Sequence, residues 1–246
     1  MSNQIYAYGK LCTLFYNATK TYAPEKEVNF YASFMNKNSR VLEAMSGSGR
    51  LQIPLIQLGF TVDGVDNSSV MLNSCRARCA DLKLSPEIYE QSLENLDLPH
   101  KYQTVTIAVG SFQLIVDRVN ALKSLKNIRA HMSDNGDLLI DIFVPDQSID
   151  SRSTRIVRID DNTIIRLTTR YVFNNQEKIA DAFCLYELIR DGVIEEQENE
   201  LMQVTWYDDN EFRELLNKAG FEVVNIYQEI FRASGPSRVV HAKPNL

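Results

Sequence analysis

Short apolar runs alternate with segments of helical periodicity from Arg40 to about Pro145, and this alternation constrains the fold more than any other feature. Parallel strands cannot be joined by tight turns, so each pair needs a crossover connection, which is usually a helix. The expected strands are residues 40–45, 61–66, 87–91, 104–109 and 137–144. The expected helices are residues 49–58, 68–81 and 119–132. Because such crossovers are right-handed, the pattern predicts an α/β fold with a doubly wound, mostly parallel sheet.

The periodicity changes after residue 150, and the chain is mostly strand-like as far as residue 206. Asp191-Gly192 separates two of these strand-like runs and is typical of a hairpin turn. We therefore expect an inserted antiparallel β excursion at residues 150–206, within a single domain of residues 1–246. A helix at 208–219, beginning at Asp208 or Asp209, and two closing strands at 221–230 and 239–242 bring the expected sheet to seven strands.

The first 36 residues hold five of the eleven tyrosines, so this segment must bury or present aromatic surface. We expect residues 1–36 to form a helical cap ahead of the first strand. Two interpretations are open: the cap packs over the sheet, or it is a lid that closes over a ligand.

A pair of glycines follows the first expected strand and precedes the first expected helix. Gly47 and Gly49 let the backbone turn tightly and approach a ligand without an intervening Cβ, and the following helix offers unpaired N–H groups. Asp66 ends the next strand, 19 residues after Gly47, where an acid can accept hydrogen bonds from a ribose diol. The arrangement predicts a nucleoside-containing cofactor. The alternative is a tight turn with a capping acid.

Two residues bear on which cofactor binds. A dinucleotide fingerprint needs a third glycine, but position 52 is Gln. Glu43, inside the first strand, would repel a pyrophosphate and suits a ligand that carries an ammonium and a sulfonium. These residues disfavour an NAD-linked oxidoreductase. We keep two alternative functions: that oxidoreductase, and a non-catalytic module that binds the nucleoside cofactor.

The pattern Glu43-x-x-x-Gly47-x-Gly49-Arg50, followed by Asp66, resembles the first two motifs of the class I S-adenosylmethionine-dependent methyltransferases. The likeness continues through residues 96–99, 111–113, 127–129, 135–136, 139–141 and 219–221, and it covers the chain from about Tyr16 onward. It implies a Rossmann-like methyltransferase fold and S-adenosylmethionine as the cofactor. The chain departs from the family at Met45, where a glycine is usual, and at Ser92, where an aspartate is usual.

The resemblance also implies roles for individual residues. Glu43 would contact the methionine ammonium, Asp66 the ribose hydroxyls, and the exit of the fourth strand would face the sulfonium. The implied cofactor-binding residues are Glu43, Ala44, Gly47, Gly49, Arg50, Asp66, Asn67, Met71, Ser92, Leu93, Val109 and Gly110.

Residues for the acceptor and for catalysis are less marked in the sequence. Aromatic faces and hydroxyls suit small organic ligands, and we expect the acceptor to meet Tyr16, Ser111, Tyr171 and Trp206. No nucleophile–base pair stands out, so no catalytic residue is assigned. Methyl transfer by in-line displacement needs mainly alignment, and a general base only if the acceptor is protonated. We interpret the acidic run at residues 195–200 as a solvated hairpin edge.

Net charge and cysteine usage limit the partners. The net charge is −6 with no basic run, which disfavours nucleic acid and anionic membrane surfaces as partners. The four cysteines show no CxxC pairing, so we expect reduced thiols, no metal site and a cytoplasmic protein. We find no signal peptide and no apolar stretch of membrane-spanning length. The expected partner is a small-molecule acceptor. Formation of a homodimer is a further possibility that the sequence leaves undecided.

Overall fold

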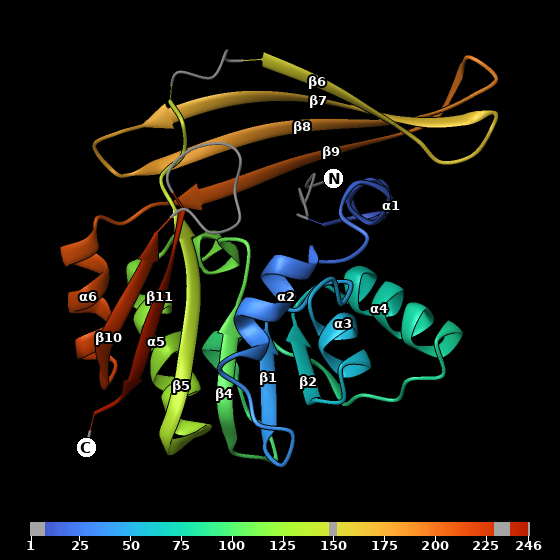
Figure 1. The fold of residues 1–246 in the computed structure, drawn as a ribbon. Helices are drawn as coiled ribbons and strands as arrows, with labels where there is room; N and C mark the ends of the chain where they lie inside the picture. The colour runs from blue at the N-terminus through green and yellow to red at the C-terminus, as the bar shows by residue number, and fades with distance from the viewer. Residues whose placement is uncertain (1–7, 148–151, 229–236, 246) are drawn as a thin grey trace.

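The computed structural model describes residues 8–147, 152–228 and 237–245. Two sheets make up the architecture, and the smaller one lies across one end of the larger one (Figure 1). The ends of two expected segments, residues 1–7 of the N-terminal cap and residues 229–230 of a closing strand, lie outside the described residues, as do residues 150–151 of the insertion.

The larger sheet has seven strands in the order β10-β11-β5-β4-β1-β2-β3. Strand β11 is antiparallel to both of its neighbours, and the other neighbouring pairs are parallel. The predicted doubly wound, mostly parallel sheet is therefore confirmed. Its strands are β1 (Arg40–Ala44), β2 (Thr61–Asp66), β3 (Ile88–Glu90), β4 (Tyr102–Ile107), β5 (Met132–Phe143), β10 (Phe221–Gln228) and β11 (Ser237–Pro244).

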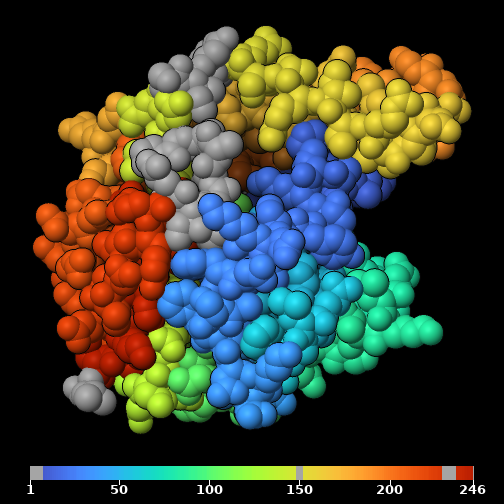
Figure 2. All heavy atoms as spheres, in the orientation of Figure 1, coloured from blue at the N-terminus to red at the C-terminus, as the bar shows by residue number. Residues whose placement is uncertain are grey.

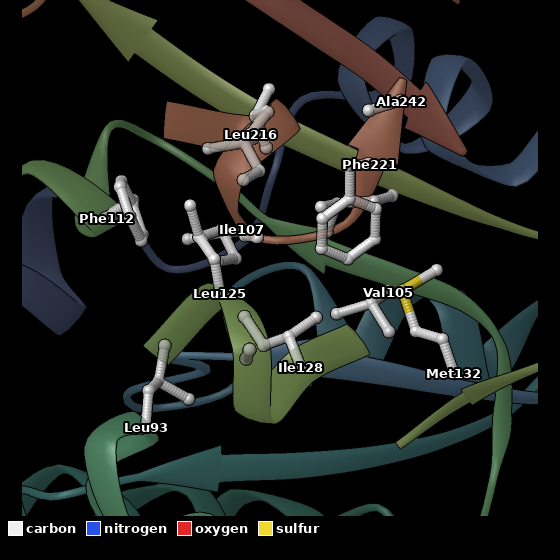
Figure 3. Packing of buried hydrophobic residues seen from close by; sticks show 14 of the residues in the cluster. Leu93, Val105, Ile107, Phe112, Leu125, Ile128, Met132, Leu216, Phe221 and Ala242 are labelled. Carbon is white, nitrogen blue, oxygen red and sulfur yellow. The ribbon is translucent and has the colours of Figure 1, made fainter. Parts of the chain in front are cut away.

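Helices cover both faces of this sheet because apolar side chains point alternately to either side of each strand. Leu138 of β5 packs in the core on one face, and the next residue, Leu139, packs in the core on the other. One core includes α5 (Arg118–Ala130) and α6 (Asp209–Lys218), as Figure 3 shows for Leu125, Ile128 and Leu216 against the strands. The other includes α2 (Glu25–Ala32) and α3 (Gln52–Gln57), with α4 (Ser69–Asp81) packed beside α3.

The starts of two helices show how well sequence signals place boundaries. Asp208, one of the two predicted N-cap residues, is the N-cap of α6, and a reciprocal pair of hydrogen bonds with Glu211 forms a capping box that was not predicted. Helix α3 begins three residues later than predicted, at Gln52, because Gly49 has a left-handed backbone with φ of +78°. A Cβ at Gly49 would lie 2.6 Å from Cys75 Sγ, so glycine is required there for helix packing as well.

The smaller sheet is antiparallel and has the strand order β6-β7-β8-β9. These strands are β6 (Arg152–Arg158), β7 (Thr163–Asn174), β8 (Ile179–Arg190) and β9 (Val193–Thr205). The predicted turn at Asp191-Gly192 joins β8 to β9, and φ is positive at both residues, as a tight hairpin requires. The strands pair with one another rather than extending the larger sheet.

Helix α1 (Lys10–Thr19) lies against one face of the smaller sheet, and glutamates of β9 hold its first turn. Glu198 accepts hydrogen bonds from the backbone N–H groups of Leu11 and Cys12, at 3.1 and 3.2 Å. Glu200 accepts one from Gly9 N–H at 2.5 Å. A Cβ on Gly9 would lie only 2.6 Å from the Glu198 carboxylate. In Figure 2 the blue N-terminal segment lies directly beneath the yellow strands.

This contact corrects part of the interpretation of residues 195–200 as a solvated edge: β9 is an edge strand with residues 195, 197 and 199 exposed, but Glu198 and Glu200 face α1. Carboxylates are favourable at a helix N-terminus, where four backbone donors lack partners within the helix. Glu200 is buried, and Glu196 forms an ion pair of 2.6 Å with Lys10. The acidic run was misread because its partner lies about 190 residues earlier in the chain.

Among the described residues, none of the helices combines the length and the apolar character that crossing a bilayer would require.

We predict that Glu198→Ala frays the first turn of α1. Loss of a capping acceptor costs about 0.5–2 kcal/mol, so the free energy of unfolding should fall by that amount. Hydrogen exchange should accelerate at the amides of Leu11 and Cys12. Glu196→Ala is the matched control, because its exposed ion pair with Lys10 contributes at most about 1 kcal/mol. Equal effects from the two substitutions would contradict the capping role.

Candidate functional site

Two adjoining cavities lie at the carboxyl edge of the parallel strands, the usual place for ligands in open α/β sheets. The smaller cavity has a volume of about 60 Å³ and is lined by the loop after β1 and by Asp66. The larger has a volume of about 380 Å³ and lies between the two sheets. Five residues line both cavities: Tyr8, Tyr16, Val109, Ser111 and Leu114.

The loop after β1 shapes the smaller cavity through backbone conformation. Met45, Gly47 and Gly49 all have positive φ, at +60°, +54° and +78°. Gly47 N–H donates to Asp66 Oδ2 at 2.9 Å, and Ser46 N–H donates to the Val65 carbonyl at 3.0 Å. The loop is thus fastened to the end of β2. Met45 adopts the left-handed backbone that a glycine would adopt without strain.

Glu43 contributes a buried carboxyl group to this cavity. Its side chain is 4% exposed, and within the part of the chain that the structure describes its Oε2 atom has no hydrogen-bond partner. Burial raises the pKa of Glu43 to about 8, although Arg50 lowers it in part. Such an acceptor is costly in a protein unless a ligand completes it. A cationic donor group, such as an ammonium, is the complement.

Arg50 follows the glycines and ties the loop to α2. Its guanidinium forms two hydrogen bonds with the buried carboxylate of Glu27, at 2.9 and 2.5 Å. The Arg50 carbonyl accepts a hydrogen bond of 2.9 Å from Ala23 N–H, just before α2. This bidentate pair fixes both the guanidinium and the entry to α2 beside Glu43.

Asp66 ends β2, and backbone donors orient its carboxylate. Oδ2 accepts from Gly47 N–H and Oδ1 from Ser68 N–H, at 2.9 and 2.8 Å. Burial raises the pKa of Asp66, while these hydrogen bonds lower it. Each carboxylate oxygen can accept more than one hydrogen bond, so the oriented group keeps acceptor capacity toward the cavity.

Alternate residues of the smaller sheet line the larger cavity, as side-chain alternation along a strand requires. Strand β7 contributes Leu167, Thr169, Tyr171 and Phe173, and β8 contributes Ala180, Ala182, Cys184 and Tyr186. The register places Tyr171 opposite Ala182 and Phe173 opposite Ala180. Because each aromatic side chain lies opposite a small alanine, this part of the sheet leaves space for the cavity.

A family model described as a methyltransferase domain matches residues 41–136, from the start of β1 into β5. A protein of Geobacillus sp. (strain WCH70) that is named as a methyltransferase is 24% identical over 198 residues, which are 80% of this chain and 79% of the relative. A solved S-adenosylmethionine-dependent methyltransferase from Clostridium acetobutylicum is similar with a TM-score of 0.77 at 16% identity, over 95% of this chain and 97% of the other. The sugar N-methyltransferase KedS8 from Streptoalloteichus sp. is similar with a TM-score of 0.79 at 15% identity, over 100% and 98% of the two chains.

Residues 41–136 thus match a methyltransferase domain, and the sequence and structural similarities support an S-adenosylmethionine-dependent methyltransferase.

In this methyltransferase, most of the residues predicted to bind cofactor lie around the smaller cavity. Those that line it are Glu43, Gly47, Arg50, Asp66, Asn67, Met71 and Val109. Gly110 lines the larger cavity, as do the predicted acceptor residues Tyr16, Ser111 and Tyr171.

Five predicted residues do not line either cavity: Ala44, Gly49, Ser92, Leu93 and Trp206. The side chain of Ala44 points away from Glu43 into the opposite core, because neighbouring strand residues face opposite sides. Leu93 is buried in the same core. The Ser92–Leu93 segment nevertheless begins right after Gln91, whose N–H donates to the Asp66 carbonyl at 3.0 Å, so its place beside Asp66 fits the expected adenine end.

Trp206 needs a separate correction. It follows the last residue of β9, where the chain leaves the sheet toward α6, and it is 7% exposed. Its N–H donates to the Lys178 carbonyl and its carbonyl accepts from Arg118, at 3.2 and 3.1 Å. The inward positions of β9 are filled instead by Met202 and Val204.

Several residues that line the smaller cavity were not among the predicted site residues: Tyr8, Met45, Ser46, Ala108 and Leu114. Tyr8 precedes α1 and reaches the site only through packing of distant segments. Ala108 and Leu114 flank Val109 and Gly110, whose φ values are +59° and +73°. Val109 and Gly110 were both expected at the cofactor site, but the left-handed backbone of Val109 was not predicted. Glu27, the partner of Arg50, carried no local signal.

We predict that cofactor binding by the methyltransferase releases protons. Glu43 is neutral below about pH 8 in the free protein, and a cationic ligand favours the carboxylate. The dissociation constant of S-adenosylhomocysteine, whose ammonium stays charged, should therefore fall as the pH rises from 6 to 8. Calorimetry in buffers with different ionisation enthalpies measures the protons directly.

Glu43→Gln is the control for this pH dependence. It should bind S-adenosylhomocysteine more weakly at pH 8 and lose the dependence between pH 6 and 8. Because a raised carboxyl pKa makes folding less favourable as pH rises from 4.5 toward 8, this variant should also be more stable than the wild type at pH 8. A wild-type dissociation constant that is flat from pH 6 to 8 would contradict the assignment.

Proposed function

We propose that the enzyme transfers a methyl group from S-adenosylmethionine to a small-molecule acceptor held between the two sheets. The observation that carries this proposal is the shared wall of the two cavities. A volume of about 380 Å³ suits a small molecule. The similarity to a sugar N-methyltransferase supports a small acceptor as well.

The donor fits the residues of the smaller cavity. The unpartnered Oε2 of Glu43 would receive the methionine ammonium, and Asp66 would accept from the ribose hydroxyls. Gly47 would let the loop lie against the ligand, because its φ of +54° suits a glycine and it adds no Cβ on the cavity side. Asn67 and Met71 would flank the adenine, with Ser92 and Leu93 at its far edge.

S-adenosylmethionine supplies a methyl group that is already activated by a sulfonium, so in-line displacement is the expected chemistry. The chain has to align the acceptor and exclude water. Ser111 lines both cavities, and its hydroxyl donates to the Ala108 carbonyl at 2.9 Å, which fixes its orientation at their junction. Burial raises the pKa of Tyr16 to about 12, so its hydroxyl stays neutral beside the transfer path.

The smaller cavity must enlarge for this cofactor. Its volume of about 60 Å³ is well below the several hundred Å³ of a typical cofactor site. Tyr8 and Tyr16 come from the N-terminal segment and line both cavities, so their movement would open the site. This supports the lid interpretation of the N-terminal segment over a purely structural cap.

Two alternatives are testable against this proposal. An NAD-linked oxidoreductase would need close backbone approach at position 52, but Gln52 is fully buried and donates to the Val62 carbonyl at 3.1 Å. A non-catalytic module would bind S-adenosylmethionine without turnover. Calorimetry with NAD and S-adenosylhomocysteine, followed by an assay for S-adenosylhomocysteine with a broad panel of acceptors, separates the three. Heat from NAD alone would overturn the proposal.

We predict that Asp66→Ala weakens S-adenosylhomocysteine binding by about tenfold or more. Hydrogen bonds to a charged group contribute about 1.5–3 kcal/mol each, and the loss of the Gly47 contact also loosens the loop. Asp66→Asn keeps one oxygen acceptor and should have an intermediate effect. Circular dichroism checks that both variants fold. An unchanged dissociation constant would reduce Asp66 to a capping residue.

We predict that Ala182→Phe abolishes turnover while cofactor affinity stays within about twofold. The larger side chain would fill the space opposite Tyr171. Leu185→Phe is the control, because residue 185 faces away from the cavity on the same strand. A variant that turns over its acceptor normally after Ala182→Phe would place the acceptor elsewhere.

A further inference from the structure

One arginine lines the larger cavity, and its charge is not matched by an acid. Arg155 of β6 borders the cavity, whereas Arg166 and Arg190 of the same sheet form ion pairs with Glu187 and Glu195. Within residues 8–147, 152–228 and 237–245, no carboxylate lies within ion-pairing distance of Arg155. Its guanidinium instead lies 5.3 Å from the centre of the Phe15 ring on α1.

Arg155 lies on the edge strand β6, exposed to solvent, at the rim of the cavity that it lines. The register places it opposite Leu167 of β7, which in turn lies opposite Tyr186 of β8, and all three line the cavity. Its charge also acts on Cys184 on the inner wall, where it lowers the pKa of that thiol against the larger effect of burial. By contrast, Arg170 stacks on Phe183, which is outside the cavity lining.

The rest of the wall is mostly apolar or aromatic. Tyr171 and Phe173 are stacked with ring centres 6.3 Å apart, and Ala180 and Ala182 leave room beside them. Hydroxyl-bearing side chains on this wall include Ser111, Thr169 and several tyrosines, Tyr186 among them. The other charged groups at this cavity are Lys20, whose ammonium lies 5.2 Å from the centre of the Tyr16 ring, and Asp146 after β5.

We propose that the acceptor carries an acidic group, which Arg155 binds, on an apolar or aromatic body that lies along β7 and β8. A guanidinium presents a planar fork of donors that matches carboxylate, sulfonate and phosphate oxygens. The methyl-accepting atom lies away from Arg155, near Ser111 and Val109, where the larger cavity adjoins the smaller one. This inference rests on the proposed function, since it assigns the larger cavity to the acceptor.

The test uses the fluorescence of N-phenyl-1-naphthylamine, an uncharged dye that reports on apolar cavities, in the full-length protein. Competitors share a naphthalene body: 1-naphthoate, naphthalene-1-sulfonate, 1-naphthyl phosphate and neutral 1-naphthalenemethanol. At least one of the anions should displace the dye at about one tenth of the concentration that the neutral alcohol requires. The most effective of the three anions then indicates which acidic group the acceptor carries. Arg155→Ala should remove that preference, Arg155→Lys should keep part of it, and dye binding itself should not change.

Arg158→Ala is the matched control, because Arg158 lies on the same strand but does not line the cavity. It should leave the anion preference intact. Equal displacement by the alcohol and all three anions, or a preference that survives Arg155→Ala, would overturn the proposal. S-adenosylhomocysteine affinity is measured on the same samples. If the wild type did not bind S-adenosylhomocysteine, the proposed function would be contradicted while the anion result would stand. The proposed function and the role of Arg155 can therefore fail separately.

Discussion

The hydrogen bonds between β9 and the first turn of α1 hold the active-site region together. Glu198 and Glu200 accept from three backbone N–H groups at residues 9, 11 and 12, across about 190 residues of sequence. Because α1 contributes walls to both cavities, this contact decides how the smaller sheet sits above the larger one. A second link lies at the other end of the helix, where Asn17 donates to Ser74 of α4 at 2.7 Å. The helix thus bridges the sheet that would hold the acceptor and the layer that would hold the donor.

The sequence predicted the larger sheet well because its signals are local. Alternating apolar strands and helices, Asp208 as N-cap and the Asp191-Gly192 turn depend on residues a few positions apart. The loop from Glu43 to Arg50 and the acid at Asp66 were likewise found from spacing alone, and they do meet around one cavity.

The remaining features depend on contacts that no local pattern encodes. The pairing of Arg50 with Glu27 and the reach of Tyr8 into the site follow from how distant segments pack. The misassigned residues show the same limit: Ala44 is adjacent to Glu43 in sequence but faces the opposite core, and Trp206 lies just past the end of its strand. Period-two alternation along β7 and β8 did carry the signal for Thr169 and Phe173. It could be used only once the cavity-facing side of that sheet was known.

The two cavities share five residues, but most of the remaining walls come from different parts of the chain. Most residues around the smaller cavity come from the ends of β1, β2 and β4 and the loops that follow, where several backbone φ values are positive. Much of the wall of the larger cavity consists of alternate side chains on a regular antiparallel ladder. Substitutions at those inward positions change the shape and charge of the cavity but leave the ladder hydrogen bonds in place. Point substitutions at those positions would therefore alter which molecules the larger cavity can hold without altering the loops around the smaller one.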